Sequence, residues 1–140
     1  MQTYLSNSVE ETERFAQEFG KTLKDGDCLA FFGDLGAGKT AFVRGLTRGL
    51  GIEAEVSSPT FALVHEYRGA HTLYHYDMYR VDSFDSLYST GFFDVVGTDA
   101  ILAVEWSENI EGALPSPYIA VTIESLGETQ RRITIARNAG

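Results

Sequence analysis

Residues 33–40 read Gly33-Asp34-Leu35-Gly36-Ala37-Gly38-Lys39-Thr40, a complete Gly-x-x-x-x-Gly-Lys-Thr phosphate-binding loop. The apolar run at residues 28–32 comes directly before this loop and predicts a buried strand. After it, residues 40–50 carry apolar side chains at the spacing of a helix face. A glycine-rich loop between a strand and a helix N-terminus binds phosphate through backbone N–H groups and the helix dipole. The sequence therefore predicts a nucleoside triphosphate site.

The loop needs further side chains before it can hydrolyse a triphosphate. We expect Lys39 to reach the β- and γ-phosphates and Thr40 to bind Mg²⁺, which also requires a carboxylate from a neighbouring strand. Asp77 and Glu105 each follow an apolar run, so both are expected at the carboxyl ends of strands, where α/β sheets bind ligands. Glu105 is the better candidate for the metal because its strand is wholly apolar. Asp77 either orients the attacking water or binds the metal shell itself.

The rest of the chain predicts one α/β domain over residues 1–140. Ser8 and Glu11 form a capping box, which predicts a helix that continues through Leu23 and ends near residues 25–26. Further strands are expected at residues 2–5, 61–67, 72–76, 100–104, 118–123 and 131–136, with a loop at 57–60 and weak helical signal at 83–90. We therefore predict a P-loop NTPase fold with a mixed β-sheet flanked by helices and a C-terminal β-hairpin.

Composition narrows the possible partners and compartment. A net charge of -9 argues against a broad nucleic-acid-binding surface, which needs clustered Lys and Arg. The only cysteine, Cys28, is expected to be a buried strand residue, and the lack of a possible internal disulfide suits a reducing cytoplasm. No apolar stretch approaches 18 residues and no signal peptide is visible, so we expect a cytoplasmic protein with no membrane segment.

Other proteins built on this loop remain as alternatives. A GTPase is rejected because the Asn-Lys-x-Asp motif that reads guanine is missing. A small-molecule kinase is disfavoured because such enzymes usually carry an arginine-rich lid, and only Arg131, Arg132 and Arg137 follow Glu105. A nucleotide-dependent switch that works without hydrolysis stays open.

Four further segments accompany the phosphate loop: Gly26-Asp27, Ser58-Pro59-Thr60-Phe61, Tyr76-Asp77-Met78-Tyr79-Arg80 and Val104-Glu105-Trp106. In this order and spacing they resemble the TsaE family (also called YjeE), the small ATPases of bacterial tRNA threonylcarbamoyladenosine biosynthesis. The resemblance covers nearly the whole chain. The segment at residues 86–92 departs from the acidic and Leu-Gly pattern usual in the family, which concerns partner contacts and not the ATP site.

The resemblance implies a set of site residues. Lys39, Asp77 and Glu105 would be catalytic, and Thr40 and Glu105 would hold the metal. Ser58-Pro59-Thr60 would be a switch-like loop beside the γ-phosphate. The nucleotide would contact Asp34, Leu35, Gly36, Ala37, Gly38, Lys39, Thr40, Ala41, Thr12 and Thr60.

The resemblance also implies a biological setting. Members bind and hydrolyse ATP with Mg²⁺, weakly when alone, as accessory subunits required for threonylcarbamoylation of adenosine 37 in tRNA. They act on a TsaB–TsaD complex, so this chain would meet tRNA only indirectly. An acidic ATPase that docks on a tRNA-handling assembly agrees with the missing basic surface.

Overall fold

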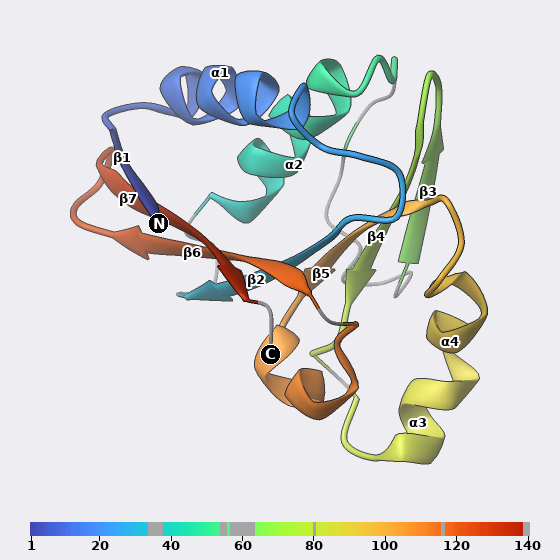
Figure 1. Cartoon of the computed structure of the whole chain (residues 1–140). Coiled ribbons are helices and arrows are strands. Elements are labelled where there is room, and N and C mark those ends of the chain that lie inside the picture. Colours follow the sequence, from blue (N-terminus) through green and yellow to red (C-terminus); the bar gives the residue numbers. More distant parts are fainter. Residues whose placement is uncertain (34–37, 54–55, 57–63, 80, 116, 139–140) are drawn as a thin grey trace.

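The computed structural model describes residues 1–33, 38–53, 56, 64–79, 81–115 and 117–138. In this part of the chain, seven strands form one sheet with helices on both faces (Figure 1). The strands are β1 (Gln2–Ser6), β2 (Cys28–Gly33), β3 (Val64–Arg68), β4 (Thr72–Asp77), β5 (Ile101–Glu105), β6 (Tyr118–Ser125) and β7 (Arg131–Asn138). The helices are α1 (Val9–Gly20), α2 (Lys39–Gly49), α3 (Phe84–Ser89) and α4 (Phe92–Val95), followed by a 3₁₀ segment, η1 (Ser107–Ala113).

Parallel strands form the middle of the sheet and antiparallel strands form both edges. The strand order is β1-β7-β6-β2-β5-β4-β3. Strand β2 pairs in parallel with β5 and β6, and β5 pairs in parallel with β4. The outer pairs β1–β7, β6–β7 and β3–β4 are antiparallel. The predictions of a mixed sheet, an edge strand at the N-terminus and a C-terminal hairpin are therefore confirmed.

The strands predicted to be central from their apolar runs occupy the centre. Strand β5 is buried at all five positions, as expected for a parallel strand covered on both faces. On one face, helices α1 and α2 pack on a core where Phe31 and Phe42 meet edge to face at 5.6 Å between ring centroids. On the other face, Leu102 and Val104 pack with Phe92 of α4 and with Ile110 of η1. Figure 1 shows these two helical layers on opposite sides of the sheet.

The single cysteine is part of the second of these cores. Burial, with a smaller contribution from the charge of Asp27, raises the pKa of the Cys28 thiol to about 12. A thiol with that pKa stays protonated and unreactive near neutral pH. The position of Cys28 fits the interpretation of a small buried strand residue.

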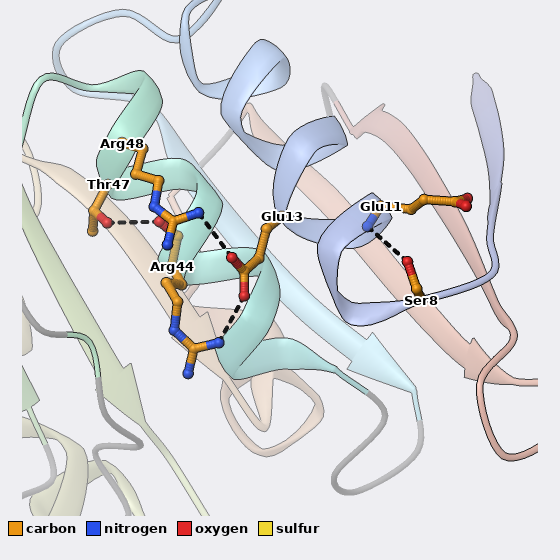
Figure 2. A network of polar contacts seen from close by, with 6 residues as sticks. All are labelled: Ser8, Glu11, Glu13, Arg44, Thr47 and Arg48. Carbon is orange, nitrogen blue, oxygen red and sulfur yellow. Dashed lines mark hydrogen bonds and ion pairs between the residues drawn. The ribbon is translucent and has the colours of Figure 1, made fainter.

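Helix α1 begins at the predicted cap. The Ser8 hydroxyl accepts the backbone N–H of Glu11 at 3.1 Å, as Figure 2 shows. The Glu11 carboxylate accepts the N–H of Asn7 at 3.1 Å, one residue earlier than in a standard capping box. Both bonds satisfy N–H groups that the first turn of a helix cannot pair internally.

Helix α1 ends earlier than the sequence predicts. Its last residue is Gly20, so the expected continuation through Leu23 to residues 25–26 is wrong. The N–H groups of Thr22 and Leu23 bond to carbonyls three residues back, at 2.9 and 3.2 Å, which tightens the chain into a 3₁₀-like turn. Leu23 is still buried, because the 3₁₀-like turn places its side chain in the core although the α-helix has already ended. Helix α4 and segment η1 are elements that the sequence analysis missed.

Some predicted segments are described only in part, or have other bounds in the structure. The loop at 57–60 and the first three residues of the strand expected at 61–67 lie outside the described residues, and β3 occupies 64–68. Helix α3 falls inside the expected 83–90 and stops before Gly91, whose φ is +82°. In the described part of the chain, no helix has the length and apolar character needed to cross a membrane.

Glycines let α1 and α2 touch backbone to backbone. A Cβ atom added at Gly45 would lie 2.3 Å from the Glu13 carbonyl oxygen, and one at Gly49 would lie 2.2 Å from the Gln17 carbonyl oxygen. Beside this contact, the Glu13 carboxylate accepts from the guanidinium groups of Arg44 and Arg48 at 2.9 and 2.8 Å (Figure 2). The ion pairs are partly exposed, so the close approach contributes more to this interface than they do.

We expect Gly45→Ala to lower the free energy of unfolding by about 2 kcal/mol, the upper part of the overpacking cost less the gain in helix propensity. The added methyl group must push α1 away from α2, a cost of about 1–3 kcal/mol or more, while the gain in helix propensity is only about 1 kcal/mol. Urea unfolding followed by circular dichroism measures the change. Gly112→Ala is the matched control, because no atom lies within 4 Å of its added Cβ. Equal midpoints for the two variants would contradict this account of the interface.

Candidate active site

The described ends of the phosphate loop have the expected strand–loop–helix geometry. Strand β2 ends at Gly33 and helix α2 begins at Lys39, so the loop bridges a central strand and a helix N-terminus. Gly38 caps the helix with φ of +102°, a left-handed conformation that glycine adopts without strain. Thr40 lies half-buried in the first turn of α2. Residues Asp34, Leu35, Gly36, Ala37 and Thr60, predicted to contact the nucleotide, lie outside the described residues.

Lys39 is a buried cation that faces an aromatic ring. Only 4% of the residue is exposed, and its Nζ lies 5.4 Å from the centroid of the Trp106 ring. Within the described residues, Lys39 forms no ion pair with a carboxylate. A buried ammonium group whose described neighbour is an aromatic ring is costly to desolvate, and an anionic ligand would offset that cost. This arrangement fits a phosphate group.

The backbone turns sharply where β5 meets η1, directly after Glu105. Trp106 has φ of +59°, which makes it the only non-glycine residue with positive φ in the described part of the chain. The ring of Trp106 packs on that of Tyr79, with centroids 4.9 Å apart. The Trp106 carbonyl accepts the N–H of Asn109, and the Asn109 amide donates to the carbonyl of Met78 at 2.8 Å. These contacts hold the indole between the segment after β4 and the start of α2.

Asp77 and Glu105 lie side by side at the carboxyl ends of β4 and β5. They are register partners on parallel strands, and only 4% and 8% of these residues are exposed. Asp77 Oδ1 accepts the N–H of Tyr79 at 2.9 Å, and Glu105 Oε2 accepts from His75 Nε2 at 2.5 Å. Within the described residues these bonds occupy one oxygen of each carboxylate, leaving the second for a metal or a water. The prediction that both acidic residues lie at the carboxyl ends of strands is correct.

A cavity of about 360 Å³ adjoins the start of α2 from the side of α1. It brings Thr12, predicted to lie near the nucleotide, together with Gly38 of the phosphate loop and Ala41 of α2. The Thr12 hydroxyl is buried and lies 2.7 Å from the Ser6 hydroxyl. The remaining lining residues are Ser8, Val9, Glu10, Glu128, Thr129 and Arg131. The predicted residues thus form two groups, one on each side of the first turn of α2.

Sequence reasoning missed two parts of this site. The β6–β7 turn, with Glu128 and Thr129, was expected only as a hairpin, and nothing in its composition indicates that it borders a cavity. His75 is not among the site residues that the sequence predicts. The position of His75 two residues before Asp77 was the available signal, because residues i and i+2 of a strand share a face.

The donor set is suited to a metal that arrives with a nucleotide. In the described part of the chain, no group of three or more His, Cys, Asp and Glu side chains could hold a metal ion. Mg²⁺ at nucleotide sites usually has only one or two protein carboxylates, with phosphate oxygens and waters as further ligands. Thr40 and the pair Asp77 and Glu105 meet that lower requirement.

Two comparisons of the sequence with known proteins point to one family. A sequence model of the family described as "Threonylcarbamoyl adenosine biosynthesis protein TsaE" matches residues 6–133. The chain is 37% identical over 132 residues to the tRNA threonylcarbamoyladenosine biosynthesis protein TsaE of Treponema pallidum, covering 94% of this chain and 98% of that one. It is 40% identical over 126 residues to the TsaE protein of Bacillus subtilis, covering 89% and 78% of the two chains.

A solved structure extends the likeness to three dimensions. The crystal structure of Bacillus subtilis YdiB has a TM-score of 0.79 and 35% identity to this chain, and the match covers 99% of this chain and 86% of that one. The matches in sequence and structure span almost the whole length of the protein. The chain therefore belongs to the TsaE family of tRNA threonylcarbamoyladenosine biosynthesis proteins.

Proposed function

We propose that this protein binds and hydrolyses ATP with Mg²⁺, as an accessory subunit required for threonylcarbamoylation of adenosine 37 in tRNA. It acts on a TsaB–TsaD-like complex and meets tRNA only through that complex. The observation that carries the proposal is the buried Lys39 ammonium at the start of α2. It contacts the ring of Trp106, the residue that directly follows Glu105 at the end of β5. A cation and a carboxylate pair beside one helix N-terminus are the parts that a triphosphate with its metal requires.

Each residue has a role that follows from its chemistry. Bound Mg–ATP supplies the phosphoryl group and a cation that neutralises its charge. Lys39 donates to phosphate oxygens and balances the charge that builds up during transfer. Thr40 and Glu105 provide oxygen ligands for the metal. Asp77 accepts a hydrogen bond from the attacking water and so orients it.

The remaining predicted contacts divide between the phosphates and the nucleoside. Residues 34–41 would bind the phosphates through backbone N–H groups, and Thr60 would contact the γ-phosphate. The cavity of about 360 Å³ beside Gly38, Ala41 and Thr12 takes part of the nucleoside. Its mixed lining of hydroxyl, apolar and charged side chains suits a ribose and a base edge.

Charge supports an indirect contact with tRNA. A protein with a net charge of -9 is repelled by the phosphates of RNA unless a basic partner lies between them. The TsaB–TsaD-like complex would be that partner, and the cytoplasm, where tRNA is modified, would be the compartment.

Lys39→Ala and Glu105→Ala should separate binding from hydrolysis. We expect Lys39→Ala to weaken ATP binding about 10- to 150-fold, since charge-assisted hydrogen bonds contribute about 1.5–3 kcal/mol. Glu105→Ala should keep most of the nucleotide affinity and lose at least about 100-fold in turnover, because metal positioning supplies several kcal/mol to the transition state. Calorimetric titration and phosphate release measure the two effects.

Lys24→Ala, at an exposed lysine outside the site, should leave both quantities unchanged. Wild-type ATP affinity in Lys39→Ala would contradict the site. If Glu105→Ala binds ATP without hydrolysing it and still supports many cycles of tRNA modification, the protein is a nucleotide-dependent switch and hydrolysis is dispensable.

Trp106, the single tryptophan of the chain, should report on the charge of Lys39. The Nζ of Lys39 lies 5.4 Å from the ring centroid, so its removal or its movement toward phosphate changes the field on the indole. We expect a change in fluorescence emission on adding ATP, and a change already present in nucleotide-free Lys39→Met. Identical nucleotide-free spectra of the wild type and Lys39→Met would show that the cation–π contact is not populated in solution.

The partner is tested by ATP turnover with and without a TsaB–TsaD complex. We expect turnover to rise several-fold when the complex is present, and the two components to co-migrate in gel filtration with ATP. Phosphate transfer to a metabolite without any partner would instead support a small-molecule kinase. Absence of both stimulation and binding, with a complex active in other assays, would overturn the proposed partnership.

A further inference from the structure

We infer that His75 is a positioning residue that holds the Glu105 carboxylate in the orientation needed to bind the metal. The inference rests on the proposed function and extends it to a residue that the family resemblance did not single out. His75 lies on β4, fully buried, with its Nε2 atom 2.5 Å from Glu105 Oε2.

The sheet register explains how the two side chains meet. The register partner of His75 on β5 is Ala103, and that of Asp77 is Glu105. Side chains two residues apart on a strand share a face, so all four lie on one face of the sheet. Ala103 packs in the same core as α2, which identifies this face as the one that α2 covers. Because Ala103 ends at its methyl group, the imidazole has room to reach diagonally to Glu105.

The chemistry of the pair fixes the direction of the hydrogen bond. An ionised carboxylate only accepts, so Nε2 carries the proton and His75 is the donor. The other ring nitrogen, Nδ1, is buried, and within the described residues it has no hydrogen-bond partner. The imidazole therefore makes its one described polar contact with Glu105.

A purely structural role does not account for a histidine here. An apolar side chain would fill the same space without burying a polar nitrogen that has no partner among the described residues, a cost of about 1–3 kcal/mol. The benefit that offsets this cost is the bond to Glu105. With Oε2 held by His75, the carboxylate cannot rotate freely, and Oε1 is left for a ligand. Partners of this kind, which orient a metal-binding side chain, typically change metal affinity or activity by about 10- to 100-fold.

The test compares His75→Leu with His75→Gln by a binding measurement that does not need turnover. The probe is fluorescent ADP, titrated into each variant in EDTA and at a series of increasing Mg²⁺ concentrations. In the wild type, we expect Mg²⁺ to tighten binding. In His75→Leu, we expect unchanged affinity in EDTA and a loss of Mg²⁺ affinity, so that the Mg²⁺ concentration required for half-maximal tightening rises about 10-fold. His75→Gln should recover most of the loss, because the glutamine amide places a donor near the position of Nε2.

Controls keep the outcome decisive. His71→Gln, at a partly exposed histidine in the β3–β4 turn, should behave as the wild type. Thermal unfolding establishes that each variant folds. If His75→Leu does not fold, His75→Asn takes its place, because its amide is polar but too short to reach Glu105.

Two results would overturn different statements. Wild-type dependence on Mg²⁺ in a folded His75→Leu, or a His75→Gln no better than its apolar counterpart, would overturn the positioning role alone. Failure of the wild type itself to bind ADP would overturn the proposed function, together with the inference that rests on it.

Discussion

Parallel pairing of β5 with both β2 and β4 is the constraint from which the site follows. Strand β5 is apolar along its interior and buried on both faces, so it is stable only between two other strands and under two helical layers. In that position its carboxyl end lies beside those of β2 and β4. The phosphate loop leaves β2 there, and Asp77 and Glu105 end the other two strands. The candidate site thus lies at the strand ends where hydrophobic burial stops.

Polar groups at this edge are buried to an extent unusual for charged side chains. Lys39, Asp77 and Glu105 are each less than one-tenth exposed, and each has one described neighbour that partly compensates for lost water: an indole, a backbone N–H and an imidazole. Electrostatic interactions are stronger in such surroundings than in water, so a ligand with complementary charges gains more from them. The same burial makes each compensating neighbour matter, which is why Trp106 and His75 belong to the description of the site.

The sequence was most informative where one physical rule dominated. The continuous apolar runs before Glu105 and inside β2 could only be central strands, and the Ser8 cap could only begin a helix. The end of α1 could not be predicted, because it depends on how closely Gly20 approaches α2 and on i−3 hydrogen bonds at Thr22 and Leu23. Helix α4 and segment η1 were missed because they are short and are held by packing against the sheet.

The candidate site also combines residues that a local sequence pattern predicts with contacts that depend on tertiary structure. The placement of Asp77 and Glu105 at neighbouring strand ends was predictable, because each follows an apolar run, and that of Lys39 and Thr40 followed from the loop motif. Their roles toward phosphate and Mg²⁺ are predictions. The contacts of His75 and Trp106 required the register between β4 and β5 and the backbone turn after Glu105, neither of which a local pattern encodes. The roles of Asp34, Leu35, Gly36, Ala37 and Thr60 remain predictions, since these residues lie outside those described.

The backbone contact between α1 and α2 has a geometric consequence for the cavity beside the phosphate loop. One wall of that cavity is the first turn of α1 and another is the first turn of α2, so its width is the spacing between two helix starts. That spacing is set at Gly20, Gly45 and Gly49, where the helices touch without intervening side chains. The three glycines therefore determine the width of the cavity. They limit the size of a ligand that fits between the first turns of α1 and α2, although none of them lines the cavity.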